Sequence, residues 1–333
     1  QALATADSPF YTNIRTRPWI RGRAGDNRKA VVSAFGFGGA NYHAVLEEYQ
    51  GLPTVGHNQP ASFQQWPSEL LFWRGASVEE IVAQLQMLHG QLASIQSLPL
   101  ADLAHTVCTA TSKARPADGE HRLSLALVAP SVDDLRGKLE NALRALAEGV
   151  SELADPRGIY FPRTPLAASG KTAFLFPGQG SQYVHMLADL AVQFPFVREL
   201  FERTDTLLAP QYPTPLSAAV FPPDVFTQEE KVGQKRALAD TRVAQPALGT
   251  ADLALHHLLR AANVVPEMVA GHSYGEYVAL CAAGVFAEED LILLSAARAR
   301  CIVEGAGDEP GTMAAVEADG QTVAEAIAAL PGV

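Results

Sequence analysis

Ser273 lies in a setting suited to nucleophilic catalysis. It is the central residue of Gly271-His-Ser-Tyr-Gly275, which follows an apolar run over residues 264–270 and precedes an Ala-rich run with helical spacing. A strand, a tight turn and a helix in this order are the pattern of a nucleophile elbow. The two glycines allow strand and helix to approach closely, and N–H groups at the helix N-terminus can stabilise an oxyanion. The alternative is a chance G-x-S-x-G in a chain rich in Ala and Gly.

A second motif lies upstream, in residues 171–182 (KTAFLFPGQGSQ). An apolar strand over Ala173–Phe176 leads into a glycine-rich turn. Such a turn could bind a phosphate, but this one lacks the G-K-[ST] ending of a nucleotide-binding loop. On its residues alone it is also compatible with an ordinary strand-to-helix turn in which Ser181 is a cap.

The two motifs together are more specific than either one. FPGQGSQ followed by GHSYGE resembles the malonyl-/acyl-CoA:acyl carrier protein acyltransferase domain of polyketide and fatty-acid synthases. The resemblance implies that Ser273 is the nucleophile, which takes an acyl group from CoA as an ester. It also implies that the backbone N–H groups of Gln179 and Tyr274 form the oxyanion hole.

Three further residues are assigned to substrate binding. The resemblance implies that Arg298 pairs with the free carboxylate of a malonyl-type substrate, which a planar guanidinium can hold bidentately. Spacing alone favours a solvated arginine on a helix face, as we expect for Arg300. Gln245 lies in TRVAQPALG, which resembles the family's T-x-x-x-Q-P-A segment, and is expected to line the site. His272 lies beside the nucleophile but points elsewhere at an elbow, so we do not expect it to be the base.

The general base is not evident. A serine needs a neighbouring base to become a good nucleophile, and the family takes its base from a segment after the serine. All nine histidines of this chain lie at or before position 272. Either an upstream residue such as His185 or His272 acts as the base, or the chain is a fragment that is inactive alone. A strand over 311–316 and a helix over 322–330 are expected to begin a ferredoxin-like subdomain.

The first fifty residues resemble the C-terminal segment of a β-ketoacyl synthase domain. A strand beginning at Val31, a turn over 35–39 (FGFGG) and a returning strand over 44–46 carry this resemblance, with Ala40 in place of the usual hydroxyl residue. The form NYHAVLEEY is more similar to iterative enediyne and polyunsaturated-fatty-acid synthases than to modular ones. The domains expected are therefore the synthase segment (1–50), a linker domain (51–170) and the acyltransferase domain (171–333).

The fold expected is α/β, with a small α/β linker domain followed by a parallel-sheet acyltransferase core. In the linker domain, we expect strands over 69–73 and 123–128 and a helix over 101–111. Ser77 and Glu80 have the spacing of a capping box for a further helix, and Ser131 begins another. Farther along, residues 212–234 are expected to be rich in loops, and Pro246 to begin a helix over 247–262.

Composition excludes several classes of function. The net charge is −11 and the pI about 5.3, which argues against non-specific nucleic-acid binding. Three cysteines have neither disulfide nor metal-ligand spacing, so we expect no metal, no bound cofactor and a reducing, cytoplasmic location. No signal peptide and no apolar run long enough for a membrane span are seen.

The resemblance implies a fragment of a multidomain polyketide synthase that transfers an acyl group from CoA to the phosphopantetheine of an acyl carrier protein. Its other partners would be further domains of the same synthase, in a homodimeric parent. A non-catalytic structural or docking fragment and, less favoured, an α/β serine hydrolase are the alternatives. One basic cluster is either a solvated loop face or a docking site for an acidic carrier protein; it comprises Arg15, Arg17, Arg21, Arg23, Arg28 and Lys29.

Overall fold

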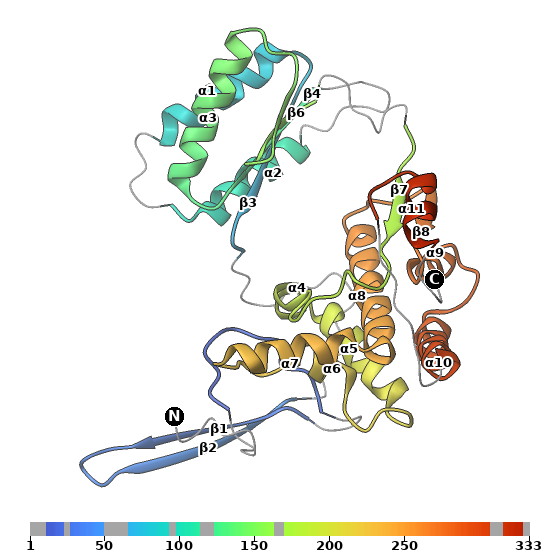
Figure 1. The fold of residues 1–333 in the computed structure, drawn as a ribbon. Helices are drawn as coiled ribbons and strands as arrows, with labels where there is room; N and C mark the ends of the chain where they lie inside the picture. The colour runs from blue at the N-terminus through green and yellow to red at the C-terminus, as the bar shows by residue number, and fades with distance from the viewer. Residues whose placement is uncertain are drawn as a thin grey trace. The chain divides into compact units, whose positions relative to one another are not determined.

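The structure is a computed structural model that describes residues 11–22, 27–49, 66–92, 98–113, 123–162, 170–306 and 316–328. The chain divides into two compact units. One contains residues 62–172, and the other contains residues 1–61 together with 173–333. Each unit is described separately below (Figure 1).

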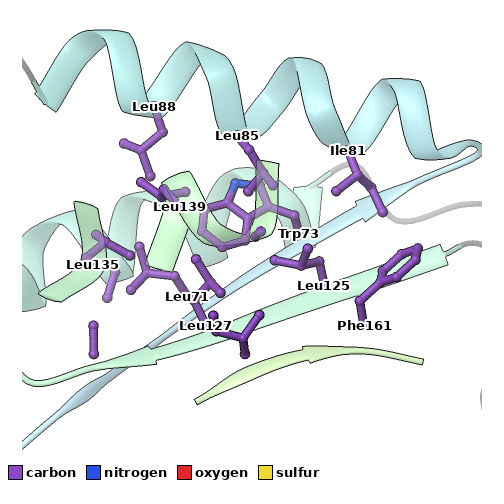
Figure 2. Close-up of a cluster of buried hydrophobic side chains, with 14 of the residues drawn as sticks. Leu71, Trp73, Ile81, Leu85, Leu88, Leu125, Leu127, Leu135, Leu139 and Phe161 are labelled. Carbon is purple, nitrogen blue, oxygen red and sulfur yellow. The ribbon is translucent and has the colours of Figure 1, made fainter. Parts of the chain in front are cut away.

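The unit over 62–172 is a four-stranded antiparallel sheet packed against helices, with strand order β3-β4-β6-β5. Its strands are β3 (Glu69–Gly75), β4 (Leu123–Ala129), β5 (Leu153–Asp155) and β6 (Ile159–Phe161), and its helices are α1 (Val78–Leu92), α2 (Leu100–Lys113) and α3 (Val132–Ala147). Figure 2 shows Ile81 and Leu85 of α1 pointing toward the sheet side chains Trp73 and Leu125. All four are almost fully buried, and each such side chain contributes about 1.5–3 kcal/mol through burial.

The expected helices and strands of this unit are confirmed, and the sequence missed one hairpin. The helix and strand positions agree with the periodicity, and the Glu80 N–H donates to Ser77 Oγ at 3.3 Å. The missed hairpin is formed by β5 and β6, which are three residues each. Gly158 permits it, because its φ is +108° and a Cβ there would collide with the carbonyl of Val128.

In the other unit, residues 27–49 form an antiparallel hairpin of β1 (Lys29–Phe35) and β2 (Asn41–Glu47). Its strands are mostly exposed, but ion pairs hold the end of the hairpin where its two strands join the rest of the chain. Arg21 and Arg28 both donate to Glu48, at 2.7 and 2.5 Å, and Arg28 also pairs with Glu202 of α5 (Pro195–Leu208). The Arg21 hydrogen bond lowers the pKa of Glu48 to about 2.

The basic cluster was expected to be either a solvated loop face or a docking site for an acidic carrier protein, and the structure instead shows its described arginines paired within the chain. Besides Arg21 and Arg28, Arg15 pairs with Asp224 at 2.5 Å and Arg17 donates to the Phe221 carbonyl. Arg23 lies outside the described residues. The described arginines of the cluster hold the N-terminal segment to residues 202–224, so they are already occupied by partners within the chain.

The part of this unit from residue 173 onward is built on a parallel pair of strands, β7 (Ala173–Phe176) and β8 (Met268–Gly271). Besides α5, its helices are α4 (Ala188–Gln193), α6 (Leu216–Val220), α7 (Gln228–Ala239), α8 (Thr241–Ala261), α9 (Gly275–Ala282), α10 (Glu288–Ala306) and α11 (Gly320–Ile327). The long helix α8 contacts α5, α6, α7, α9 and α10, and most of its residues are buried. It is therefore the central helix of this unit (Figure 1).

One expectation about this region is met in part and another is wrong. Residues 212–215 and 221–227 lie outside helices, but the segment also contains α6 and the start of α7, where Thr227 and Glu230 form a capping box. Helix α8 begins at Thr241 rather than at residue 247, with Asp240 as its N-cap, so Pro246 lies inside the helix. Pro246 has no N–H for the carbonyl of Arg242, and the Tyr212 hydroxyl donates to that carbonyl instead, at 2.7 Å.

The C-terminal expectations are tested only in part. The helix expected over 322–330 is α11, which begins two residues earlier, at Gly320, because Asp319 caps it by accepting from the N–H groups of Gln321 and Thr322. The strand expected over 311–316 falls on residues 311–315, which lie outside the described residues, and on Val316, which is not in a strand. None of the helices formed by described residues is long and apolar enough to cross a bilayer.

Asp252 is a buried carboxyl on the central helix. It is 5% exposed, and its Oδ2 has no hydrogen-bond partner among the described residues. Burial raises its pKa from 3.8 to about 7. The folded protein therefore keeps a proton that the unfolded chain loses near pH 4, and stability should fall as the pH rises from about 4 to about 7 and then level off.

Asp252→Asn should remove this pH dependence. At about pH 8 the variant should be more stable than the wild type by about 2–4 kcal/mol, since one pKa unit is about 1.4 kcal/mol. Urea unfolding followed by circular dichroism between about pH 5 and pH 8 would measure the difference. The control is Asp189→Asn, at an aspartate in the first turn of α4 that is not fully buried. If Asp252→Asn and the wild type kept the same pH profile, Asp252 would titrate normally.

Candidate active site

The two motifs that could do chemistry meet at one edge of the parallel sheet. The register of β7 and β8 pairs Phe176 with Gly271, the last residues of the two strands. The ladder continues into the turn, where the His272 N–H donates to the Phe176 carbonyl at 3.1 Å. The FPGQG turn and the GHSYG turn therefore leave adjacent strands at their carboxyl ends, where ligands bind in open α/β sheets.

Three glycines allow the elbow to turn tightly and the two turns to lie close together. A Cβ on Gly271 would collide with the backbone of Gly275, and a Cβ on Gly275 would collide with the carbonyls of Phe176 and Pro177. The expectation that both elbow positions exclude a side chain is confirmed. Gly178, whose role the sequence did not reveal, acts in the same way from the other turn, because its Cβ would lie 2.5 Å from the carbonyl oxygen of the residue before Ser273 and 3.2 Å from Ser273 Cβ.

Ser273 has the strained backbone of an elbow. Its φ is +54°, in the left-handed region that costs a residue with a Cβ about 1–3 kcal/mol. The side chain is exposed, and α9 begins two residues later. Within the described part of the chain, the Ser273 hydroxyl forms no hydrogen bond with a base.

The two candidate oxyanion donors are unoccupied. Neither the N–H of Gln179 nor that of Tyr274 donates a hydrogen bond to any described residue. The Gln179 side chain is fixed from α8, since its Nε2 donates to Thr241 Oγ1 at 3.0 Å and its Oε1 accepts from Gln245 at 3.2 Å. Gln245 is 1% exposed, so it supports the turn that carries Gln179.

The Tyr274 side chain is part of the core behind the elbow. It is fully buried, and its hydroxyl donates to Ser295 Oγ at 2.5 Å, which in turn donates to the Leu291 carbonyl at 2.6 Å. A Cβ on Gly249 would occupy the position of that hydroxyl. Burial raises the pKa of Tyr274, against the smaller opposing effect of the Ser295 hydrogen bond. Tyr274 is therefore a neutral residue held rigidly.

Arg298 and Arg300 differ in burial and in their contacts. Arg298 is half-buried on α10 and lies over the ring of Tyr277, with the guanidinium carbon 5.4 Å from the ring centroid. It forms no ion pair or hydrogen bond with any residue that the structure describes. Arg300 is exposed and lies 4.0 Å from Glu304. Of the two, only Arg298 combines partial burial with an uncompensated charge.

The described histidines do not supply a base in this geometry. His185 is held by Arg15, which donates to its Nε2 at 2.5 Å, and burial, followed by the charge of Arg15, lowers its pKa. His256 packs against Phe174 and Phe176. His272 is exposed and has no hydrogen bond to Ser273. Among the described residues, no group of three His, Cys, Asp or Glu side chains could hold a metal.

Sequence reasoning missed the supporting residues of the site. Ser295 and Tyr277 contact the candidate residues but belong to no motif, and Thr241 opens the TRVAQPALG segment without any sign of its contact with Gln179. The spacing of Tyr274 and Tyr277 on one helix face was the available signal, since residues three apart on a helix are neighbours.

Comparison with known proteins agrees with this geometry. Residues 173–333 match the family described as the acyl transferase domain. Polyketide synthase GfsB of Streptomyces halstedii is 33% identical over 319 residues, which cover 95% of this chain and 5% of that protein. A polyunsaturated fatty acid synthase of Thraustochytrium sp. is 28% identical over 318 residues, 92% of this chain and 11% of that protein. The chain thus spans only a small part of these relatives.

Solved structures give the same fold. The acyl transferase domain of ZmaA superposes with a TM-score of 0.56 at 25% identity, over 72% of this chain and 50% of that chain. The acyltransferase domain from module 8 of the salinomycin polyketide synthase superposes with a TM-score of 0.55 at 22% identity, over 79% and 56%. The expected α/β acyltransferase fold is confirmed. Residues 173–333 therefore form an acyltransferase domain of the type found in polyketide synthases.

Proposed function

We propose that this domain transfers a malonyl-type acyl group from CoA to the phosphopantetheine thiol of an acyl carrier protein, through an ester on Ser273. The observation that carries the proposal is Arg298, a half-buried cation without an ionic partner among the described residues. A guanidinium in this state can bind the free carboxylate of a malonyl group bidentately.

In the first half-reaction, Ser273 Oγ attacks the thioester carbonyl. The carbonyl oxygen becomes an oxyanion, which the N–H groups of Gln179 and Tyr274 stabilise. When the intermediate collapses, the carbon–sulfur bond breaks and CoA leaves as its thiol, with the proton that Ser273 lost. In the second half-reaction, the carrier-protein thiol attacks the seryl ester and Ser273 regains its proton. The protein needs no bound cofactor for this chemistry.

His272 and Gln245 complete the proposed site in different ways. Gln245 acts through Gln179, whose side chain it holds at 3.2 Å. His272 has an exposed side chain next to the nucleophile, where it can contact the acyl group or the pantetheine. The base that receives the Ser273 proton belongs, by resemblance, to a segment after Ser273.

The rest of the chain fits a multidomain synthase. We propose that residues 1–50 are the end of a ketosynthase domain and that residues 51–170 are the linker domain before the acyltransferase. The described arginines of the basic cluster join residues 15–28 to the acyltransferase domain through Glu202 and Asp224, and the first assignment rests on the resemblance of residues 28–48. The partners proposed are the carrier protein and further domains of a dimeric synthase of the iterative type.

A non-catalytic structural role is the second candidate. The observation that favours it is the Ser273 hydroxyl, which has no hydrogen-bonded base in the described part of the chain. The two candidates differ in whether Ser273 can be acylated.

Malonyl-CoA should acylate Ser273. Intact-protein mass spectrometry should detect one added malonyl group, which Ser273→Ala removes and which Cys301→Ser, at an exposed thiol, leaves in place. The experiment should be made on this chain and on one that continues into the segment where the family has its base. Label on the longer chain alone would assign the base to that segment, and rapid label on both would assign it upstream. Absence of label on both would contradict the malonyl proposal.

Arg298→Ala should impair malonyl transfer selectively. Loss of a charged hydrogen-bond partner costs about 1.5–3 kcal/mol, so kcat/KM for malonyl-CoA should fall about ten- to a hundredfold, with little change for acetyl-CoA. Arg300→Ala is the matched control, since Arg300 is exposed on the same helix. An equal loss with both thioesters would exclude Arg298 as the carboxylate-binding residue.

A further inference from the structure

We propose that Tyr277 is a positioning residue for Arg298, and that Tyr274, Tyr277 and Arg298 form one stack that links the oxyanion hole to the carboxylate-binding group. This inference rests on the proposed function. It goes beyond it by assigning a role to a residue that lies outside the two sequence motifs.

The stack is continuous in space. The rings of Tyr274 and Tyr277 have centroids 6.3 Å apart and are nearly parallel, with an interplanar angle of 7°. The Arg298 guanidinium lies over Tyr277 at 5.4 Å, within the range of a cation–π interaction. The same stack therefore joins the residue after the nucleophile to the arginine on α10.

One end of the stack is anchored in the core. Tyr274 is fully buried, its hydroxyl is held by Ser295, and Gly249 leaves room for that hydroxyl. Tyr277 is half-buried one turn farther along α9. Because Tyr274 is rigid, it gives the ring of Tyr277 a fixed aromatic neighbour, and the Arg298 guanidinium lies over that Tyr277 ring.

An aromatic face has a property that a carboxylate partner lacks. A long arginine side chain loses much rotamer freedom when it binds a substrate, so an arginine that is held in place beforehand binds more tightly. A carboxylate could hold it, but it would occupy the N–H groups and neutralise the charge that the substrate needs. The ring attracts the guanidinium through its face and leaves the hydrogen-bonding edge available for the acyl carboxylate.

The test compares Tyr277→Phe with Tyr277→Leu. The Phe variant keeps the ring and removes only the hydroxyl, whereas the Leu variant keeps an apolar side chain and removes the ring. Binding of malonyl-CoA and acetyl-CoA should be measured by calorimetry in a Ser273→Ala background, so that no turnover is needed. We expect Tyr277→Leu to lower the preference for malonyl-CoA about three- to tenfold, the range of a partly exposed cation–π contact, and Tyr277→Phe to retain it.

A spectroscopic signal tests the geometry without any ligand. The side-chain protons of Arg298 lie over the ring and should have an upfield ring-current shift in the NMR spectrum of arginine-labelled protein, identified by its loss in Arg298→Lys. The shift should disappear in Tyr277→Leu and persist in Tyr277→Phe. Circular dichroism should verify that each variant is folded. If Tyr277→Leu does not fold, Tyr277→Phe still tests the inference, because this variant must retain both the ring-current shift and the preference for malonyl-CoA.

The outcomes separate this inference from the proposed function. If Arg298→Ala leaves the malonyl preference unchanged, or if neither thioester binds, the proposed function fails. If Arg298→Ala abolishes the preference while Tyr277→Leu preserves it, Arg298 binds the carboxylate without help from Tyr277 and the positioning role is overturned. Loss of the preference in Tyr277→Phe as well would overturn the role of the ring and assign the effect to the hydroxyl.

Discussion

The site depends on the contact between the backbone of Gly275 and the carbonyls at the end of β7. Two parallel strands bring their carboxyl ends together, but side chains at residues 178 and 275 would keep the two turns apart, and a side chain at residue 271 would collide with the elbow itself. With glycine at all three positions, the turn after β7 lies against the elbow. In the proposed function, the N–H of Gln179, from one turn, and the N–H of Tyr274, from the other, are the donors to the oxyanion. A donor pair held by the backbone in this way needs little rearrangement as charge develops.

Helix α8 supports both turns of the site. Gln245 donates a hydrogen bond to the Gln179 side chain, and Gly249 leaves room for the Tyr274 hydroxyl. Asp252 is buried farther along the same helix. These positions are about a turn apart and so lie along one face of the helix. A helix that places polar groups in the interior loses some stability through burial, and the raised pKa of Asp252 is the sign of that loss. The gain is a fixed environment for Gln179 and Tyr274.

The sequence predicted the local features well because they depend on local chemistry, whereas it missed features that depend on distant contacts. The elbow needs its glycines within five residues, and the strand Ala173–Phe176 is an apolar run ending at a Pro-Gly turn. The start of α8 was missed because proline is typical of a first helical turn, whereas here the Tyr212 hydroxyl, from a residue 30 positions before Arg242, satisfies the carbonyl that Pro246 leaves unpaired. Long-range charge pairing was equally beyond the sequence, since Arg28 and Glu202 are 174 residues apart.

The contrast between Arg28 and Arg298 is informative in a chain with a net charge of −11. Arg28 is held by two carboxylates and Arg298 by an aromatic ring. Carboxylates are plentiful, and an arginine placed at random near the surface would readily acquire one as a partner. A half-buried arginine that has none among the described residues, yet is held in place, needs a support that is attractive without being anionic. An aromatic ring meets that requirement, and in the proposed function the hydrogen-bonding groups of Arg298 are then available for the carboxylate of the acyl group.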